Sequence, residues 1–427
     1  MSDPAPLLIR GGNVVTAGGV TELDVLVRNG HIVEMGISLE APDVVVIDAR
    51  GCWVGPAFVD IHTHLREPGQ EHKEDIATGS AAAAAGGYTA VVAMPNTSPA
   101  IDSRDVARRI AERGREVGLV EVVPSGTITV GRSGETLAPL SELWAEGVRV
   151  FTDDGDTVAD AGLLRTAMAT IADLGGVVSQ HAVDSGLARN GHMHEGDVSV
   201  RLGIGGVPAI AEEIIIQRDV ALARLTGVRY HVQHVSTEGA LGVIAAAKAE
   251  GLPVTAEVTP HHLNFYDTDV EAGGTLFKMM PPLRTRADVA ALRAALASGL
   301  IDAVATDHAP HAPDEKATAF EEAPPGVTGL EWAATAVNTS VALDIERFFD
   351  RLSFAPARIA GIDDRHGRVP EPGGIANLVV FDPAAEWTPS TSRSRSKNSP
   401  YLGRTWRGRV RHTVYAGVHT YSAGGTG

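Results

Sequence analysis

This chain contains eight short apolar runs separated by alanine-rich stretches long enough to form helices. Two of these helical stretches are Ala77–Gly86 and Val289–Ala297. The apolar runs are Ala57–Ile61, Thr89–Met94, Val120–Val123, Val148–Phe151, Gly176–Ser179, Val228–Val232, Pro253–Val258 and Ala303–Ala305. Buried strands that alternate with helices in this number predict an α/β fold, a (β/α)8 barrel of the TIM type.

The two ends of the chain differ from this middle part. Strand-like segments alternate with turns from Leu7 to Arg28 and again from Ala376 to Tyr415. Asn29-Gly30 predicts a hairpin, because both residues tolerate a positive φ. We therefore expect a small β-sandwich formed by both termini, residues 1–54 and 365–427, beside a barrel formed by residues 55–364.

Composition narrows the classes of protein. Hydrophobic residues make up 44% of the 427 residues and charged residues 21%, a balance that can bury a full core. The formal net charge of −17 argues against nucleic acid or an anionic membrane as the partner. Cys52 is the single cysteine, which leaves no intrachain disulfide and favours a packed core residue over a nucleophile. Residues 1–6 lack a signal-peptide pattern and no segment approaches the roughly 20 apolar residues of a membrane helix, so we expect a cytoplasmic enzyme.

Each apolar run ends in polar or charged residues. The carboxyl ends of barrel strands form the active-site face, so we expect these residues to converge there. The strongest local signal is Asp60–Pro68, in which His62 and His64 lie two positions apart on a strand. Side chains at that spacing point to the same face and can reach one metal ion. Two hydrogen-bonding histidines at a strand end are the alternative.

Later runs add three more metal-binding candidates. His181 and His234 each follow an apolar run, and Asp307 follows the last one. A lone histidine at a strand end more often belongs to a core or a loop, but two in phase with the first pair are harder to dismiss. Together they predict ligands for one buried metal ion and one more open ion. Nitrogen and oxygen donors of this kind suit Zn²⁺, and Co²⁺ or Mn²⁺ could substitute.

With these residues the chain resembles the amidohydrolase superfamily and, within it, the dihydroorotases whose metal bridge is an aspartate. The resemblance covers essentially the whole chain, and its stretches are very specific in combination. They are Asp60–Pro68, Met94–Thr97, Thr152–Gly155, His234–Thr237, Thr255–His262, Asp307–His311 and Gly329–Glu331. The resemblance implies a cyclic amide hydrolase that interconverts L-dihydroorotate and N-carbamoyl-L-aspartate in de novo pyrimidine (UMP) biosynthesis.

The metal bridge sets this chain apart from many relatives. Those relatives use a carbamylated lysine at the fourth strand, but no lysine occurs here between Lys73 and Lys248. The corresponding place holds Asp153-Asp154. The family pattern implies that Asp154 spans the metals, and Asp153 is the second choice.

The resemblance also implies how the ligands divide. His62 and His64 would hold one Zn²⁺, and His181 and His234 would hold the other. Asp307 would ligate the first ion and act as general acid and base. It would take a proton as the metal-bridged hydroxide attacks and return the proton to the departing ring nitrogen.

Substrate contacts are expected around the same strand ends. Arg66 lies two positions beyond His64 and offers a planar fork suited to a carboxylate. An ion pair with Glu67 or Glu71 is the alternative for this arginine. The resemblance implies further substrate contacts by His64, Asn96, His311, Pro325 and Gly326.

Three positions depart from the family pattern. Met280 stands where relatives usually have a substrate-contacting asparagine. Pro325 stands where an aromatic residue is usual, and Val183-Asp184 replaces a frequent acidic pair. These departures concern substrate affinity and the capping loop rather than the class of reaction.

Two other functions compete with this hypothesis. A hydantoinase, dihydropyrimidinase or allantoinase would share the barrel and His-x-His, but would normally need the missing lysine and would not need Arg66. An inactive dihydroorotase-like partner of aspartate transcarbamoylase should have lost metal ligands, whereas all six candidates are present. We expect a small-molecule substrate and a homo-oligomer, with a dimer favoured and association with aspartate transcarbamoylase left open.

Overall fold

A computed structural model describes residues 5–424. Residues 1–4 and 425–427 lie outside the described residues, and so does most of the segment on which the signal-peptide expectation rests. The strands are β1 (Leu7–Thr16), β2 (Gly19–Arg28), β3 (His31–Gly36), β4 (Val45–Asp48), β5 (Trp53–Pro56), β6 (Phe58–Thr63), β7 (Tyr88–Ala93), β8 (Glu121–Pro124), β9 (Val150–Phe151), β10 (Val177–Gln180), β11 (Met193–His194), β12 (Gly206–Val207), β13 (Arg229–Val232), β14 (Val254–Val258), β15 (Ala303–Val304), β16 (Leu378–Trp387), β17 (Trp406–Tyr415) and β18 (Val418–Ser422).

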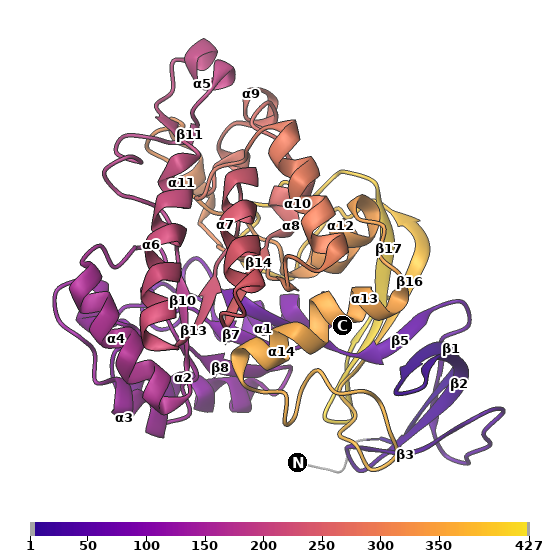
Figure 1. Cartoon of the computed structure of the whole chain (residues 1–427). Helices are drawn as coiled ribbons and strands as arrows, with labels where there is room; N and C mark the ends of the chain where they lie inside the picture. The colour runs from indigo at the N-terminus through magenta and orange to yellow at the C-terminus, as the bar shows by residue number, and fades with distance from the viewer. Residues whose placement is uncertain (1–4, 425–427) are drawn as a thin grey trace.

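Along the chain, most helices alternate with the strands of the middle part (Figure 1). They are α1 (Ile76–Ala85), α2 (Arg104–Val117), α3 (Leu140–Ala145), α4 (Ala161–Leu174), α5 (Asp197–Leu202), α6 (Ile210–Thr226), α7 (Glu238–Ala249), α8 (Pro260–Asn264), α9 (Asp269–Gly273), α10 (Arg286–Ser298), α11 (Pro313–Lys316), α12 (Ala333–Ser340), α13 (Ile345–Phe349) and α14 (Ala355–Ala360). Short 3₁₀ or π turns are η1 (Val130–Arg132), η2 (Gly274–Phe277), η3 (Leu330–Trp332) and η4 (Asp350–Phe354).

All eight apolar runs overlap strands, and those strands pair in parallel. One sheet has the order β6-β7-β8, and the other has the order β15-β14-β13-β10-β9. Two isolated parallel bridges lie between the edges of these sheets, one from Thr63 to His308 and one from Gly126 to Phe151. The predicted α/β architecture with parallel strands is therefore confirmed.

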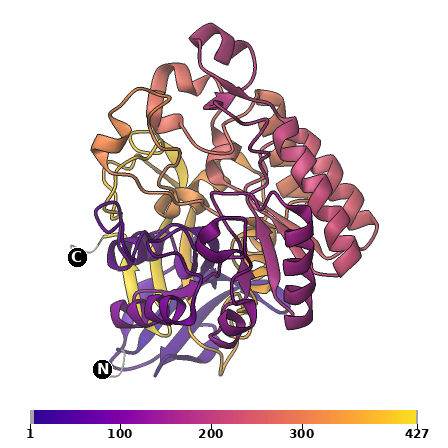
Figure 2. The same cartoon turned by 90° about the vertical axis from the view of Figure 1, so that its left-hand side faces the viewer.

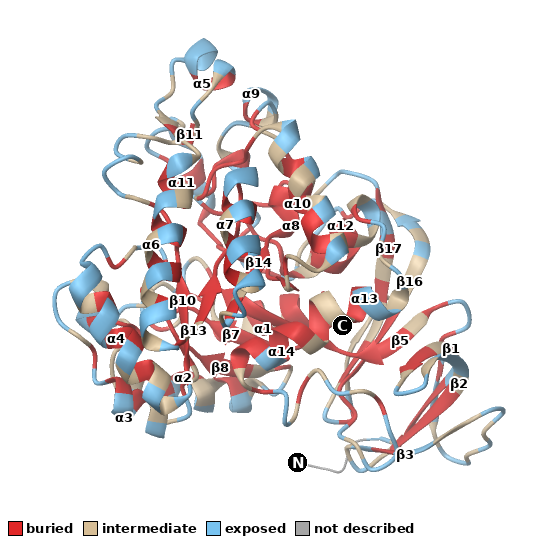
Figure 3. Cartoon of the chain, viewed as in Figure 1, coloured by how far each residue is buried: buried red, intermediate tan, exposed pale blue. Residues whose placement is uncertain are grey.

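The connecting helices begin and pack as their sequences suggest. Side-chain caps accept hydrogen bonds from first-turn N–H groups of several helices, which satisfies donors that the helix leaves free. These caps are Asp75 for α1, Asp160 for α4, Thr237 for α7 and Thr285 for α10. The parallel strands are largely buried, whereas helices such as α4 and α6 expose one side (Figure 3). Within residues 5–424, no helix has both the length and the apolar character needed to span a bilayer.

Strands from both ends of the chain form one continuous eight-stranded sheet. Its order is β18-β17-β16-β5-β1-β2-β3, with β4 paired to β1. The indigo and yellow strands lie together in both views (Figure 1 and Figure 2). Asn29 and Gly30 have φ angles of 51° and 82°, and they join β2 to β3 as the predicted hairpin. Strands from both termini thus share one sheet, through direct pairing of β5 with β16.

Aromatic side chains join this sheet to the middle part. Phe348 of α13 stacks on Phe381 of β16 with ring centroids 4.9 Å apart. It also meets Trp53 at 5.2 Å and Phe58 at 5.7 Å, both edge to face. Aromatic pairs at these separations add to the stabilisation from buried area. The sheet and the parallel strands therefore share a packed boundary.

Candidate active site

Six of the predicted residues lie at the carboxyl ends of the parallel strands. His62 is on β6, and His64 is the first residue after this strand. The other four residues each come just after a later strand. They are Asp154 after β9, His181 after β10, His234 after β13 and Asp307 after β15. All six residues are buried. Because parallel strands end at the same edge, His64 and Asp307 become neighbours although they lie 243 positions apart in sequence.

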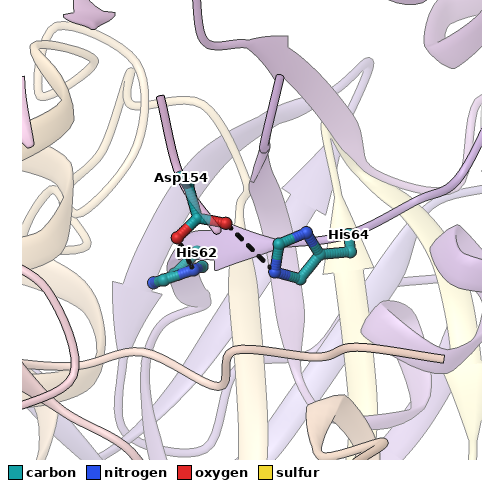
Figure 4. Close-up of side chains that lie close together, drawn as sticks. All are labelled: His62, His64 and Asp154. Carbon is teal, nitrogen blue, oxygen red and sulfur yellow. Dashed lines mark ion pairs between the residues drawn. The ribbon is translucent and has the colours of Figure 1, made fainter. Parts of the chain in front are cut away.

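The carboxylate of Asp154 lies between the side chains of His62 and His64 (Figure 4). Its Oδ1 is 3.2 Å from His62 Nε2, and its Oδ2 is 3.4 Å from His64 Nε2. On the other side, Oδ1 lies 3.8 Å from His181 Nδ1, which is 2.8 Å from His234 Nε2. Two groups of ligand atoms close enough for one ion each therefore share Asp154.

Asp307 completes this cluster from the last parallel strand. Its Oδ1 lies 3.0 Å from His64 Nε2 and 3.6 Å from His62 Nε2. Asp307 and His234 have φ angles of 44° and 32°, and Arg66 has a φ of 62°. Non-glycine residues rarely adopt positive φ, and such strain concentrates at functional sites. The fold therefore holds three residues of this site in unfavourable backbone conformations.

Asp153 is directed away from the cluster. Its Oδ1 accepts hydrogen bonds from the backbone N–H groups of Ile128 at 2.8 Å and Thr129 at 3.1 Å. Its Oδ2 accepts one from the Thr129 hydroxyl. These bonds occupy both oxygens, so the carboxylate that faces the histidines is that of Asp154.

Hydrogen bonds on the far side of the rings orient His62 and His64. His62 Nδ1–H donates to Glu257 Oε1 at 2.7 Å, and His64 Nδ1–H donates to Asn96 Oδ1 at 2.8 Å. Each Nε2 is then left with a lone pair directed at the cluster, the tautomer that metal ligation requires. Asn96, predicted to contact substrate, thus also positions a candidate metal ligand.

The charges of the cluster call for a cation. Burial by itself would lower the pKa of His62, but the nearby carboxylates, led by that of Asp154, raise it well above the usual value. Burial lowers the pKa of His181 and, with the neighbouring imidazoles, that of His234, so both are neutral rings able to ligate. Within residues 5–424, His62 Nε2 is buried without a hydrogen-bond partner. This donor set fits two divalent ions such as Zn²⁺.

A cavity of about 250 Å³ opens over the cluster. Its lining includes all the residues predicted to contact substrate as well as Met280. The lining residues are His64, Arg66, Asn96, Asp154, Gly155, His181, His234, Met280, Asp307, Ala309, His311, Pro325 and Gly326. Candidate metal ligands and a cationic side chain therefore face one small-molecule space.

Arg66 reaches this cavity as a buried cation. Its Nε–H donates to the Pro310 carbonyl at 3.2 Å, and its Nη2 lies 3.4 Å from His311 Nε2. Burial lowers the pKa of Arg66 to about 10, so the guanidinium stays charged at neutral pH. His311 Nε2–H donates to the Pro325 carbonyl at 2.8 Å, and burial together with Arg66 lowers the pKa of His311 to about 2. A charged fork and a neutral imidazole thus line one wall.

Glu257 supports the cluster, although the residue patterns predicted no role for it. This buried carboxylate accepts hydrogen bonds from His62 and, at 3.0 Å, from His231 Nε2–H. His231 Nδ1 in turn accepts from the Thr255 hydroxyl at 2.8 Å. The signal that could have found Glu257 was an acidic residue inside the apolar run Pro253–Val258, because a charge in a buried strand needs a partner.

Comparison with solved structures shows which known fold this chain shares. The solved structure of an L-hydantoinase (dihydropyrimidinase) from Arthrobacter aurescens matches with a TM-score of 0.86 at 24% sequence identity, over 97% of this chain and 96% of that one. At this identity the likeness concerns the fold. The chain thus has the fold of this hydantoinase.

Sequence similarity narrows the class to one family. The profile described as Dihydro-orotase-like matches residues 51–240. A curated dihydroorotase from Anaeromyxobacter dehalogenans is 46% identical over 428 residues, with 98% of each chain covered. One from Streptomyces coelicolor is 45% identical over 421 residues, with 97% of each chain covered. The chain belongs to the dihydroorotase family.

The two adjacent aspartates should respond differently to replacement. Loss of a residue that only hydrogen-bonds to a metal ligand weakens metal binding about 10- to 100-fold. Asp154→Ala should weaken metal binding by more than this. Asp153→Ala should keep the metal but lose about 1–3 kcal/mol of stability, because it leaves buried N–H groups unpaired. Elemental analysis and urea unfolding measure these two effects.

Metal loading of the unmodified protein should not depend on bicarbonate, since no lysine between Lys73 and Lys248 is available for carbamylation. Loss of metal from Asp153→Ala with retention in Asp154→Ala would show that the assignment is reversed.

Proposed function

We propose that this protein catalyses the reversible hydrolysis of L-dihydroorotate to N-carbamoyl-L-aspartate in de novo pyrimidine biosynthesis. Its membership of the dihydroorotase family supports this reaction. The observation that carries the proposal is the presence of Arg66 in the same cavity as the cluster around Asp154. A substrate with both a ring amide and a carboxylate uses both features.

In this proposal two divalent ions, Zn²⁺ by preference, occupy the cluster. His62, His64 and Asp307 would hold one ion, His181 and His234 the second, and Asp154 both. Such ions would lower the pKa of a bound water toward neutrality and would polarise the scissile carbonyl. Only deprotonated groups ligate, so binding would release the proton that the nearby carboxylates favour on His62, whereas His181 and His234 are already neutral.

The remaining steps belong to side chains. Asp307, beside His64, accepts the proton of the attacking water and returns it to the ring nitrogen as the amide opens. Arg66 holds the substrate carboxylate through its guanidinium fork, which the Pro310 carbonyl orients at 3.2 Å. His311, Asn96 and the Pro325-Gly326 backbone complete the pocket. In the reverse direction, the carbamoyl nitrogen attacks the side-chain carboxylate, and Asp307 takes the proton of that nitrogen and gives it to the carboxylate oxygen that leaves as hydroxide when the ring closes.

We also propose that the parallel strands close into a (β/α)8 barrel over residues 55–364. The bridges Thr63–His308 and Gly126–Phe151, which join the sheet edges, support this closure. Residues 1–54 and 365–427 would form the satellite β-sandwich. One buried cluster shared by strands from both termini, including Ile9 and Val380, supports that unit.

The assembly and location follow from the proposed role. We propose a homodimer, with association with an aspartate transcarbamoylase as the alternative assembly, and a cytoplasmic location. Analytical ultracentrifugation of the purified chain, alone and mixed with the transcarbamoylase of the same organism, separates these assemblies.

The purified protein should bind up to two divalent ions and turn over dihydroorotate. A chelator should abolish turnover, and added Zn²⁺ should restore it, because the cluster cannot act without its cations. Absorbance of the ring amide follows the reaction. Preferential turnover of hydantoin or dihydrouracil would instead favour the competing cyclic amidases.

Arg66→Met should raise the KM for dihydroorotate by about 10- to 150-fold, because one charge-assisted bond is worth about 1.5–3 kcal/mol. Metal content should change little. Arg229→Met is the matched control, since Arg229 begins β13 and also donates to main-chain carbonyls, those of Arg358 and Ile359, outside the cavity. An unchanged KM in Arg66→Met would remove the carboxylate contact from the proposal.

Met280→Asn should lower the KM severalfold and leave kcat within about threefold, as when uniform binding is restored. Met280 lines the cavity and packs against a small buried cluster that contains Val183. The adjoining backbone is already held, because His262 Nε2–H donates to the Pro281 carbonyl at 3.0 Å. Steady-state kinetics decides: an unchanged KM would show that the substrate contact does not involve this side chain.

A further inference from the structure

We propose that Asn398, from the C-terminal part of the chain, is a positioning residue that fixes the substrate-binding wall of the cavity. This inference rests on the proposed function. Asn398 is not a lining residue of the cavity over the cluster. It acts through the backbone of Ala309, His311 and Gly326, and it reaches Arg66 only through the neighbouring Pro310 carbonyl.

Two carboxylates anchor the segment that brings Asn398 to the site, residues 392–399. Glu74, fully buried before α1, accepts hydrogen bonds from the Ser394 hydroxyl and from Arg395 N–H at 2.9 Å. Glu331 accepts from the Ser392 hydroxyl and from Arg393 N–H at 2.9 Å. Hydrogen bonds to charged groups are stronger than neutral ones, so this polar segment is held firmly.

The segment alternates between buried and exposed residues. Ser394, Ser396 and Asn398 are buried, whereas the basic residues between them, Arg393, Arg395 and Lys397, are exposed. Such a period of two is that of an extended chain with one face on the protein. The alternation ends at Asn398, whose side chain is directed at the loops beyond β15.

Asn398 uses both ends of its amide. Its Nδ2 donates to the carbonyls of Ala309 at 3.0 Å and Gly326 at 3.1 Å. Its Oδ1 accepts from His311 N–H at 3.1 Å. Its main-chain carbonyl accepts from Thr328 N–H at 3.0 Å. One residue therefore ties together two loops that are separate in sequence and that both line the cavity.

These bonds set the position of Arg66 and His311. Ala309 and His311 flank Pro310, whose carbonyl accepts the hydrogen bond from Arg66 Nε–H. On the other loop, a Cβ on Gly326, at a φ of +133°, would lie 2.6 Å from Ala309 Cβ and 3.0 Å from His311 Nε2. Loops that approach this closely need a fixed separation, and the Asn398 amide supplies it from behind.

The test compares Asn398→Ala and Asn398→Asp with Asn377→Ala. In Asn398→Asp the new carboxylate would keep an acceptor for His311 N–H but would face two carbonyl oxygens without a donor. Asn377 is the matched control, because its buried amide also joins main-chain groups, the Arg365 carbonyl at 3.0 Å and Ala416 N–H at 2.7 Å, away from the cavity. Asn398→Ser, whose hydroxyl offers one donor in place of the amide, replaces any variant that does not fold.

We expect the Asn398 variants to raise the KM for dihydroorotate about tenfold or more and to leave kcat within about threefold, with unchanged metal content. Hydrogen exchange at the His311 amide should quicken in them and not in Asn377→Ala. Unchanged KM and exchange, or a loss of kcat alone, would overturn the inference.

The exchange measurement needs no substrate. If the unmodified protein fails to turn over dihydroorotate, the proposed function is wrong. Hydrogen exchange at the His311 amide in the Asn398 variants still tests whether Asn398 fixes the cavity wall.

Discussion

A buried carboxylate shared by two pairs of imidazoles governs the design of this protein. Asp154 has three histidine nitrogens, from two strand ends, within 3.8 Å of its oxygens. Buried charges are costly unless they are paired, so this concentration of polar groups is sustainable only with cations or with many compensating contacts. Parallel strands satisfy the geometry, because their carboxyl ends meet at one edge while their middles fill an apolar core. The rest of the chain either builds that edge or holds the residues that stand on it.

Hydrogen bonds from neighbouring residues hold the side chains of the cluster in place. Glu257 and Asn96 fix the tautomers of His62 and His64, and Asp153 ties down the backbone that precedes Asp154. The cavity wall that carries Arg66 and His311 is contacted from farther away in sequence, because Asn398, in the segment between β16 and β17, hydrogen-bonds the backbone of Ala309 and His311. The division into a parallel-strand part and a terminal unit is therefore not a division between function and scaffold. Both parts of the chain contribute to the geometry of one cavity.

Much of this could be predicted from residue patterns, and the reason is periodicity. Apolar runs of strand length predicted all eight parallel strands, because a strand buried on both faces must be continuously apolar. The spacing of His62 and His64 predicted that they face one point, since side chains two apart on a strand share a face. The polar residues that close each run predicted which side chains would converge. Only local geometry was needed for these inferences.

Other features depend on contacts between distant segments. The choice between Asp153 and Asp154 was open from the residues alone, and it was decided by backbone N–H groups at Ile128 and Thr129 that capture the first carboxylate. The pairing of β5 with β16, which merges the termini into one sheet, also has no local signal. In the sequence, Asn398 is one residue of a serine-rich segment. Only the tertiary structure shows that it joins two loops of the cavity by hydrogen bonds. The sequence by itself determined the strands and the ligand types, which follow from short-range periodicity and side-chain chemistry. Tertiary structure decided which carboxylate faces the histidines and what holds the cavity wall beside Arg66. Those roles depend on hydrogen bonds between segments far apart in sequence, such as the bond from Arg395 N–H to Glu74, 321 residues away.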